Sequence, residues 1–275
     1  MKQLIVTADD FGYSRQANRA IIKCFREGIV TSTSFLVNTK YFDESARLLK
    51  QNKKLDVGIH INLTEFRPLT KARALAGKNG DFIGKKIWFN GYYRHADKNE
   101  IESEINEQIT KALSSGLNIT HLNGHNHIHM LPNIIDIAVR SAKEYGIKYF
   151  RLPYEAALNK DEVKLYSTIR AKNAVARLHA KNKINKNGLK AAGAFYGSLC
   201  MKNMDYSKLA VIFNSIKNGT SELMVHPAYI DKEGDIFHQS MQREKEIELL
   251  TSNKTKQVIK KNNIKLTNFS KMSKT

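Results

Sequence analysis

The segment KQLIVTADDFGYSRQANRAIIKCFREGIVTSTSFLVN (residues 2–38) decides the fold. Its first part, residues 2–8, is a short apolar run that ends in polar residues, which is typical of a buried strand. A helix is predicted next, with Ser14 as its N-cap and Gly28 as its C-cap. The β-branched residues of 29–38 then predict a second strand. A strand, a helix and another strand in this order indicate two parallel strands joined by a crossover helix.

The same alternation continues to residue 152 and becomes less regular after Pro153. It predicts an α/β fold with a mostly parallel sheet, and the residue pattern leaves open whether that sheet is open or closed as a barrel. Further strands are predicted over residues 55–63, 118–125, 147–152, 221–229 and 264–270, and further helices over residues 41–52, 97–116, 131–146, 206–219 and 245–262.

We predict that residues 1–275 form a single domain, because the chain contains neither an internal repeat nor a low-complexity linker. Within it, residues 157–204 are expected to be a basic cap or helical insertion, with one or two helices over 157–182. A cytoplasmic protein is expected, because the N-terminus lacks the long apolar stretch of a signal peptide. A thiolate zinc site is not expected, because Cys24 and Cys200 are far apart and outside any C-x-x-C pattern.

The formal net charge is +19, and most of it comes from two segments without acidic residues. Residues 163–204 contain nine Lys or Arg, and residues 249–275 contain seven Lys. Such a charge has two alternative explanations. It keeps the protein soluble, or it serves to bind an anionic partner such as an acidic lipid surface, an acidic glycan or a nucleic acid. Aromatic residues are not interleaved with the basic ones, and no nucleic-acid module is recognisable, so nucleic acid is not an expected partner.

Polar residues with metal-binding or acid–base chemistry follow several of the predicted strands. In parallel α/β folds, functional sites gather at the carboxyl ends of the strands. Each such residue alone is a weak signal, but their joint occurrence at equivalent positions predicts one site at this edge of the sheet. The residues are Asp9 and Asp10 after the first strand, His60 and Asn62 on the third, a histidine-rich stretch on the fourth, Arg151 on the fifth and His226 after the strand that begins at residue 221.

A carboxylate combined with imidazoles suits a divalent metal such as Zn²⁺, Mn²⁺ or another first-row ion. Three protein ligands leave positions open for water and substrate. A second carboxylate next to the metal can serve as general base, and a histidine on another strand can protonate the leaving group. These groups are the ones needed to hydrolyse an amide or an ester. Asp9 and Asp10 are adjacent, so both can reach one site only where the strand turns into a loop.

The stretch HLNGHNHIHM (residues 121–130) contains four histidines. His121 is expected within the strand as buried support, and His125 near the strand end, where a metal ligand belongs. His127 and His129 follow in the predicted loop, where they are expected to support the site or contact substrate, unless they are solvated loop residues. The stretch thus supplies one metal ligand rather than four.

The motifs TADDFGYS, GIVTSTSFLVN, VGIHINLTEFRPL, THLNGHNHIHMLP and MVHPAY together resemble the YdjC-like carbohydrate deacetylases, and they run in order along most of the chain. The resemblance implies a distorted, TIM-like (β/α) barrel and metal-dependent removal of acetyl groups from N-acetylated sugars such as chito-oligosaccharides. It implies Asp10, His60 and His125 as ligands of one divalent metal, Mg or Zn, with Asp9 as base and His226 as acid.

Two of the motifs depart from the family pattern. Glu65, Phe66 and Arg67 stand where the family usually has a glycine before proline, so Phe66 is expected to place a bulky group near the mouth of the site. Gly124 stands where the family often has serine.

Asn62, His127, His129 and Arg151 are the residues expected to contact substrate. The basic segments suit an anionic or lipid-linked substrate or a membrane surface, and a homodimer is one alternative for the oligomeric state. Another metal-dependent amide or phosphoester hydrolase on the same barrel is the alternative function, although such enzymes usually open with H-x-H on the first strand. A non-catalytic basic binding protein is the third alternative, and it is disfavoured because all five predicted catalytic and metal residues are present.

Overall fold

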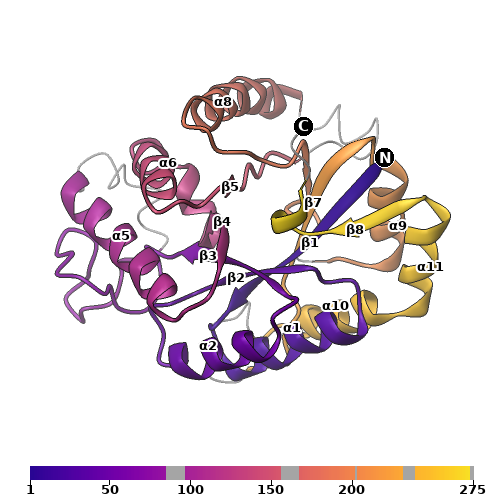
Figure 1. The fold of residues 1–275 in the computed structure, drawn as a ribbon, viewed down its shortest axis with the longest axis horizontal. Coiled ribbons are helices and arrows are strands. Elements are labelled where there is room, and N and C mark those ends of the chain that lie inside the picture. Colours follow the sequence, from indigo (N-terminus) through magenta and orange to yellow (C-terminus); the bar gives the residue numbers. More distant parts are fainter. Residues whose placement is uncertain (85–96, 156–166, 202, 232–238, 273–275) are drawn as a thin grey trace.

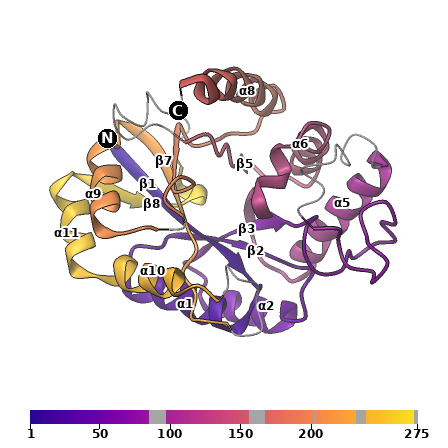
Figure 2. The same cartoon turned by 180° about the vertical axis from the view of Figure 1, so that it is seen from behind.

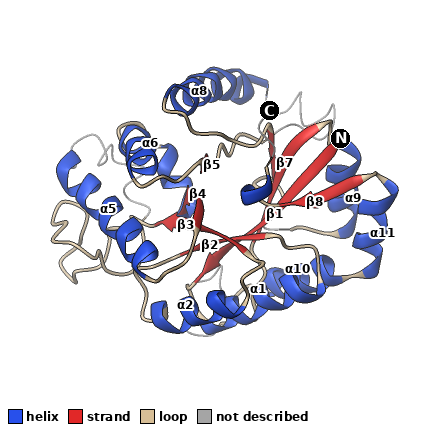
Figure 3. Ribbon diagram, in the orientation of Figure 1, coloured by secondary structure: helices blue, strands red, loops and turns tan. Residues whose placement is uncertain are grey.

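The protein is described by a computed structural model for residues 1–84, 97–155, 167–201, 203–231 and 239–272. Its centre is an eight-stranded sheet in the order β5-β4-β3-β2-β1-β7-β6, with β8 also paired to β1 (Figures 1 and 3). The paired strands run parallel. The strands are β1 Lys2–Phe11, β2 Ser32–Phe35, β3 Asp56–Ile61, β4 Ile119–Gly124, β5 Tyr149–Phe150, β6 Ala194–Tyr196, β7 Gly219–Val225 and β8 Ile264–Thr267.

Helices surround the curled sheet on its outside (Figure 2). Two isolated parallel bridges, Tyr149 to Lys190 and Glu155 to Phe195, link the β5 side of the sheet to the β6 side. The predicted distorted, mostly parallel α/β barrel is confirmed. Within the described residues, the α-helices are α1 Arg15–Glu27, α2 Phe42–Gln51, α5 Lys98–Ser114, α6 Ile134–Glu144, α8 Ser167–Lys186, α9 Tyr206–Ser215, α10 Met241–Thr251 and α11 Asn253–Lys261, and two short 3-10 helices span His125–Met130 and Phe269–Lys271.

The first crossover forms as its sequence predicts. The Ser14 hydroxyl accepts a hydrogen bond from the Ala17 N–H at 3.2 Å, which satisfies one of the free N–H groups at the start of α1. Gly28 is the C-cap of the same helix. The side chains of β1 between residues 4 and 8 are almost fully buried, because they are covered by neighbouring strands and by helices.

Two of the differences from the sequence prediction concern the C-terminal helices and β6. The single helix predicted over residues 245–262 is two helices, because Ser252 adopts an extended backbone and its hydroxyl caps α11 by accepting from the Thr255 N–H. β6 was not predicted, although it pairs with β7 in the sheet. Its three residues are too few to show an alternating pattern.

The basic segment 157–204 contributes α8 and β6. Lys183 of α8 forms an ion pair with Asp136 of α6, which joins the segment to the rest of the fold. Residues 156–166, where the predicted basic helices begin, lie outside the described residues, and so do residues 85–96. Within the described part of the chain, no helix combines the length and the apolar character that crossing a membrane requires.

His121 is fully buried in β4, as predicted. Its ring stacks on Phe269 with the centroids 4.0 Å apart, and it also lies directly against the backbone of β3. A Cβ atom at Gly58 would lie 2.4 Å from this ring. Glycine is therefore required at residue 58 if His121 is to pack between β3 and the C-terminal segment.

Candidate active site and metal centre

A β-bulge in β1 brings Asp9 and Asp10 to the same site. The register between β1 and β2 shifts between Ala8 and Phe11, and Asp10 has a left-handed backbone with φ of 69°. On a regular strand the two carboxylates would point to opposite faces. The bulge turns the carboxylate of Asp10, so that Asp9 and Asp10 both lie buried at the carboxyl edge of the sheet.

Asp10, His60 and His125 form a cluster of three potential metal ligands. One oxygen or nitrogen from each side chain lies within 4.8 Å of the others, and all three residues are buried. Asp10 Oδ1 lies 3.6 Å from His60 Nε2 and 3.3 Å from His125 Nδ1. One carboxylate oxygen and two imidazole nitrogens are a donor set that divalent first-row metals accept.

Asn123 fixes the orientation of His60. Its amide nitrogen donates to Asp9 Oδ1 at 3.2 Å, because an ionised carboxylate can only accept. The amide oxygen therefore faces His60, whose Nδ1 lies 2.6 Å away and donates to it. The lone pair of His60 is thus on Nε2, the nitrogen that faces Asp10, and this is the tautomer that a metal ligand needs.

Negative charge surrounds His125. Its Nε2 lies 3.1 Å from Glu65 Oε1, while its Nδ1 faces Asp10. Burial lowers the pKa of His125, but hydrogen bonds and charges from Asp10 and Glu65 outweigh this effect and raise it to about 10. The pocket between these carboxylates therefore stabilises positive charge, and the residues present fit a bound divalent cation.

Arg243 on α10 holds Asp10 from the other side. Its Nη2 donates to Asp10 Oδ2 at 3.1 Å, and its Nε donates to the backbone oxygen of His226 at 2.9 Å. Glu246, one turn further along α10, accepts from the His226 N–H at 2.6 Å. α10 thereby fixes the carboxylate of the ligand cluster relative to the end of β7.

Asp9 is held in a buried network of its own. Its carboxylate accepts from the Ser34 hydroxyl at 2.5 Å and from both terminal nitrogens of Arg151, one of them at 2.8 Å. Arg151 also pairs with Glu222 of β7 at 2.8 Å. Burial raises the pKa of Asp9, but the positive charge of Arg151 and smaller contributions from His60 outweigh it and hold the pKa far below its ordinary value. Asp9 is therefore ionised.

His226 directly follows β7 and is buried at the same edge of the sheet. Burial lowers its pKa to about 4, and the nearby carboxylates of Asp10 and Asp9 oppose this shift without cancelling it. The imidazole is consequently neutral at neutral pH.

The four residues predicted to contact substrate occupy different environments. Asn62 is fully buried, and its side-chain oxygen accepts from the N–H groups of Thr64 and Glu65 in a tight turn. Arg151 and His129 are also fully buried, and His129 Nε2 lies 3.2 Å from the backbone oxygen of Arg151. These three therefore support the site in this structure, whereas His127 is partly exposed.

His127 lies beside β6. Its Nε2 is 3.4 Å from the Ser198 hydroxyl, its ring is 5.9 Å from that of Phe195, and its Nδ1 has no hydrogen-bond partner in the described part of the chain. Phe66, the bulky residue expected near the mouth, is partly buried and packs edge-on against Tyr13 at 5.0 Å. Tyr13 in turn lies 6.4 Å from His125.

Several supporting residues were not predicted from the sequence. Asn123 could have been found, because it lies two residues before His125 on the same strand face. Glu65 was noted only as a departure from the family pattern. Arg243, Glu222 and Ser34 carry no local signal, because their roles depend on distant elements that pack together.

Comparison with known proteins supports the resemblance drawn from the motifs. Residues 3–261 match the family described as YdjC-like protein. The chain is 34% identical to a carbohydrate deacetylase of Thermoanaerobacter pseudethanolicus, over 98% of this chain and 99% of the relative. It is 33% identical to a chitooligosaccharide deacetylase of Yersinia enterocolitica, over 98% of each chain.

The fold has a solved counterpart. A protein of Enterococcus faecalis V583, considered to cleave cellobiose phosphate, superposes with a TM-score of 0.79 at 23% identity and with 99% of each chain covered. This likeness concerns the fold. On its sequence match over nearly the whole length, the chain belongs to the YdjC-like protein family.

Proposed function

We propose that the protein is a metal-dependent carbohydrate deacetylase that hydrolyses the acetamide bond of an N-acetylated sugar. The observation that carries this proposal is the buried cluster of Asp10, His60 and His125 next to the ionised Asp9. The names of the relatives, carbohydrate deacetylase and chitooligosaccharide deacetylase, support the substrate class. The predicted lipid-linked substrate, membrane surface and homodimer stay predictions.

Asp10 Oδ1, His60 Nε2 and His125 Nδ1 are the atoms that would hold the metal, Mg²⁺ or Zn²⁺. When bound, a divalent cation there would lower the pKa of coordinated water and polarise the acetyl carbonyl. Arg243 and Asn123 would keep two of the ligands in place, because each is hydrogen bonded to a ligand from outside the cluster.

Asp9 is proposed as the general base. Its ion pair with Arg151 keeps it ionised and ready to accept a proton, but the same pair makes it a weak base. A weak base suffices only if the pKa of the attacking water is lowered. A cation held by the neighbouring ligand cluster would lower it. Ser34, Asn123 and Arg151 hold the carboxylate in one orientation.

His226 is proposed as the group that protonates the departing amine. Because its pKa is about 4, it enters the reaction neutral and has to gain a proton before it can give one. We propose that the proton taken from water by Asp9 reaches His226 as the amide bond breaks. The carboxylates of Asp9 and Asp10 favour the imidazolium during this transfer.

The sugar is proposed to bind over Tyr13 and Phe66, whose rings pack together near His125. His127 is proposed as a sugar contact because it is partly exposed, although its Nδ1, which no described residue engages, is buried. Because Asn62, His129 and Arg151 are fully buried, we propose that they act indirectly. They keep neighbouring residues of the site in place and do not touch the sugar. No observation favours a phosphoester substrate.

Acetate release from chito-oligosaccharides by the Asp9→Asn enzyme tests the proposal. Turnover should fall by at least about 10²-fold, the usual contribution of a general base, while the bound metal is retained. Asn cannot accept the water proton but keeps a similar shape. Normal turnover in this variant would show that Asp9 is not the base, and lost metal binding would place it among the ligands.

A further inference from the structure

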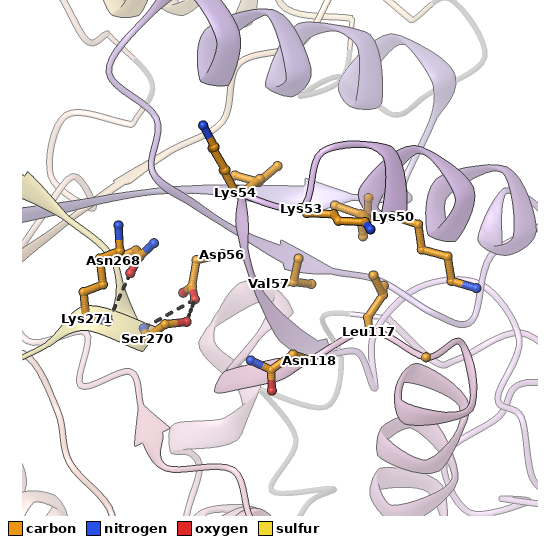
Figure 4. A pocket seen from close by; sticks show the side chains of 13 residues that line it. Lys50, Lys53, Lys54, Asp56, Val57, Leu117, Asn118, Asn268, Ser270 and Lys271 are labelled. Carbon is orange, nitrogen blue, oxygen red and sulfur yellow. Dashed lines mark hydrogen bonds between the residues drawn. The ribbon is translucent and has the colours of Figure 1, made fainter.

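A cavity lies at the opposite end of the strands from the proposed active site (Figure 4). Its volume is about 680 Å³, which is within the range in which proteins hold small-molecule ligands. Its wall contains Asp56, the first residue of β3, and Asn118, which directly precedes β4. His60 and His125 lie at the other ends of these two strands, so the cavity is separate from the ligand cluster.

Lysines from two distant parts of the chain surround this cavity. Lys50, Lys53 and Lys54 come from the end of α2 and the turn after it, whereas Lys271 comes from the short helix after β8. Figure 4 shows Lys271 on one side of Asp56 and Lys50 on the other. No carboxylate of the described residues lies within 4.0 Å of these four ammonium groups. Lys50 and Lys271 each lie in the last turn of a helix, where a positive charge compensates the helix dipole, but this effect does not explain Lys53 and Lys54, which follow α2.

The acidic residue in the wall, Asp56, does not neutralise these lysines. Its side chain is 1% exposed. Its carboxylate oxygens accept from the hydroxyls of Ser32, Thr120 and Ser270 and from the N–H of Phe269. The lining therefore contains four ammonium groups and a single carboxylate, which already accepts several hydrogen bonds, so its formal charge is positive.

The rest of the wall is mainly apolar, with Leu49, Leu55, Val57 and Leu117 among its residues. The side chains of Asn118 and Asn268 also line the cavity, and the Asn268 oxygen already accepts from the Lys271 N–H. We propose that this cavity binds a small soluble molecule that carries a phosphomonoester on an apolar body. The lysines complement the doubly charged group, and the leucines and valine contact the body.

Phenyl phosphate is a suitable probe, because it combines both features, and phenol is its uncharged control. Titration calorimetry on the metal-loaded enzyme should show saturable binding of phenyl phosphate. Lys53→Gln combined with Lys271→Gln should weaken this binding roughly tenfold or more, because two charges at the site are lost. Lys256→Gln combined with Lys260→Gln, two exposed positions on α11, removes the same net charge elsewhere and should leave the affinity unchanged.

A second readout locates the ligand. Phenyl phosphate should protect Lys53 and Lys271, but not Lys256, from an amine-acetylating reagent measured by mass spectrometry. Equal weakening in both double variants would mean that only the overall charge of the protein matters, and it would overturn the proposal. Binding that is lost in a His125→Ala enzyme but kept in both double variants would place the probe in the active site and would also overturn it. Lysine-dependent retention on phosphatidic acid vesicles without any binding of phenyl phosphate would assign these lysines to a lipid surface instead.

Discussion

The side-chain oxygen of Asn123 lies 2.6 Å from Nδ1 of His60, and the amide nitrogen of the same Asn123 donates to Asp9. One amide therefore links the proposed base to a proposed metal ligand. The charge on Asp9 sets the amide orientation, and the amide orientation sets the tautomer of His60.

Substitutions of Asn123 should separate these two effects. Asn123→Ala removes the acceptor for His60 Nδ1, so we expect the divalent-metal affinity to fall by roughly 10–100-fold. Asn123→Asp keeps an acceptor for His60 but places a second carboxylate beside Asp9, so it should retain most of the metal affinity and lose turnover. Titration calorimetry and acetate release measure the two quantities. Asn185→Ala, an exposed asparagine, is the matched control, and equal metal affinity in the Asn123→Ala and control enzymes would contradict the role given to Asn123.

Arg243→Met should destabilise the fold strongly. Arg243 is 1% exposed and its partner Asp10 would be left as a buried, less compensated charge. Removing one partner of a buried ion pair costs roughly 3–5 kcal/mol. Arg140→Met breaks an exposed pair with Glu102 and should cost about 1 kcal/mol or less. Urea unfolding of both variants checks the difference, and comparable losses would show that the contact of Arg243 with Asp10 contributes little.

His226→Gln should lower kcat by roughly 10²–10⁴-fold, with little change in metal content. The kcat should fall because Gln cannot carry the proton to the amine. The metal content should stay because His226 is not part of the ligand cluster. Steady-state kinetics and metal analysis of the purified variant provide the measurement. A normal kcat would remove His226 from the proton path.

His226 and His127 should make the metal-free protein less stable as the pH drops from 7 towards 4, whereas Glu246, whose pKa burial raises to about 7, contributes with the opposite sign. Burial lowers the pKa of His226 to about 4 and that of His127 to about 3, from an ordinary value of 6.5. Below pH 6.5 the unfolded chain therefore binds protons that the folded protein does not, and stability is lost until the folded pKa is reached. For each of these histidines, the free energy of unfolding should fall by at most about 1.4 kcal/mol per pH unit, and by less for the partly exposed His127.

His125 contributes with the opposite sign, because its pKa is raised to about 10, so its stabilisation is lost between pH 6.5 and about 10. Urea midpoints at several pH values test both directions. His127→Gln should flatten the acidic side of the profile relative to wild type and to the exposed control His179→Gln. An unchanged acidic slope in His127→Gln would mean that His127 is not held neutral by burial.

The alternation of strands and helices was accessible from sequence, and so was the grouping of the candidate site residues, because parallel strands place their carboxyl ends at one edge. Asp9, Asp10, His60, His125 and His226 all lie at this edge in the structure. The way in which Asp9 and Asp10 reach the same site was not accessible. It depends on a bulge and on the positive φ of Asp10, which strand periodicity does not report.

The supporting residues were harder to predict, for a physical reason. Arg243 contacts Asp10 across 233 positions of sequence, and the apolar residues of its own helix are not segregated onto one face. Arg151 was recognised by its place near the end of the fifth predicted strand, but its partners Asp9 and Glu222 follow from the closure of the sheet. Tertiary packing, rather than local pattern, decides such contacts.

The central claim is that Asp10, His60 and His125 bind the metal on which deacetylation depends. The most direct measurement is acetate release from N-acetylated chito-oligosaccharides after chelation and after stepwise addition of single divalent metals, for wild type and for His60→Ala. The wild-type enzyme should be inactive after chelation and recover with one metal per chain, and His60→Ala should neither bind that metal tightly nor recover. Undiminished acetate release from the fully chelated enzyme would contradict the claim.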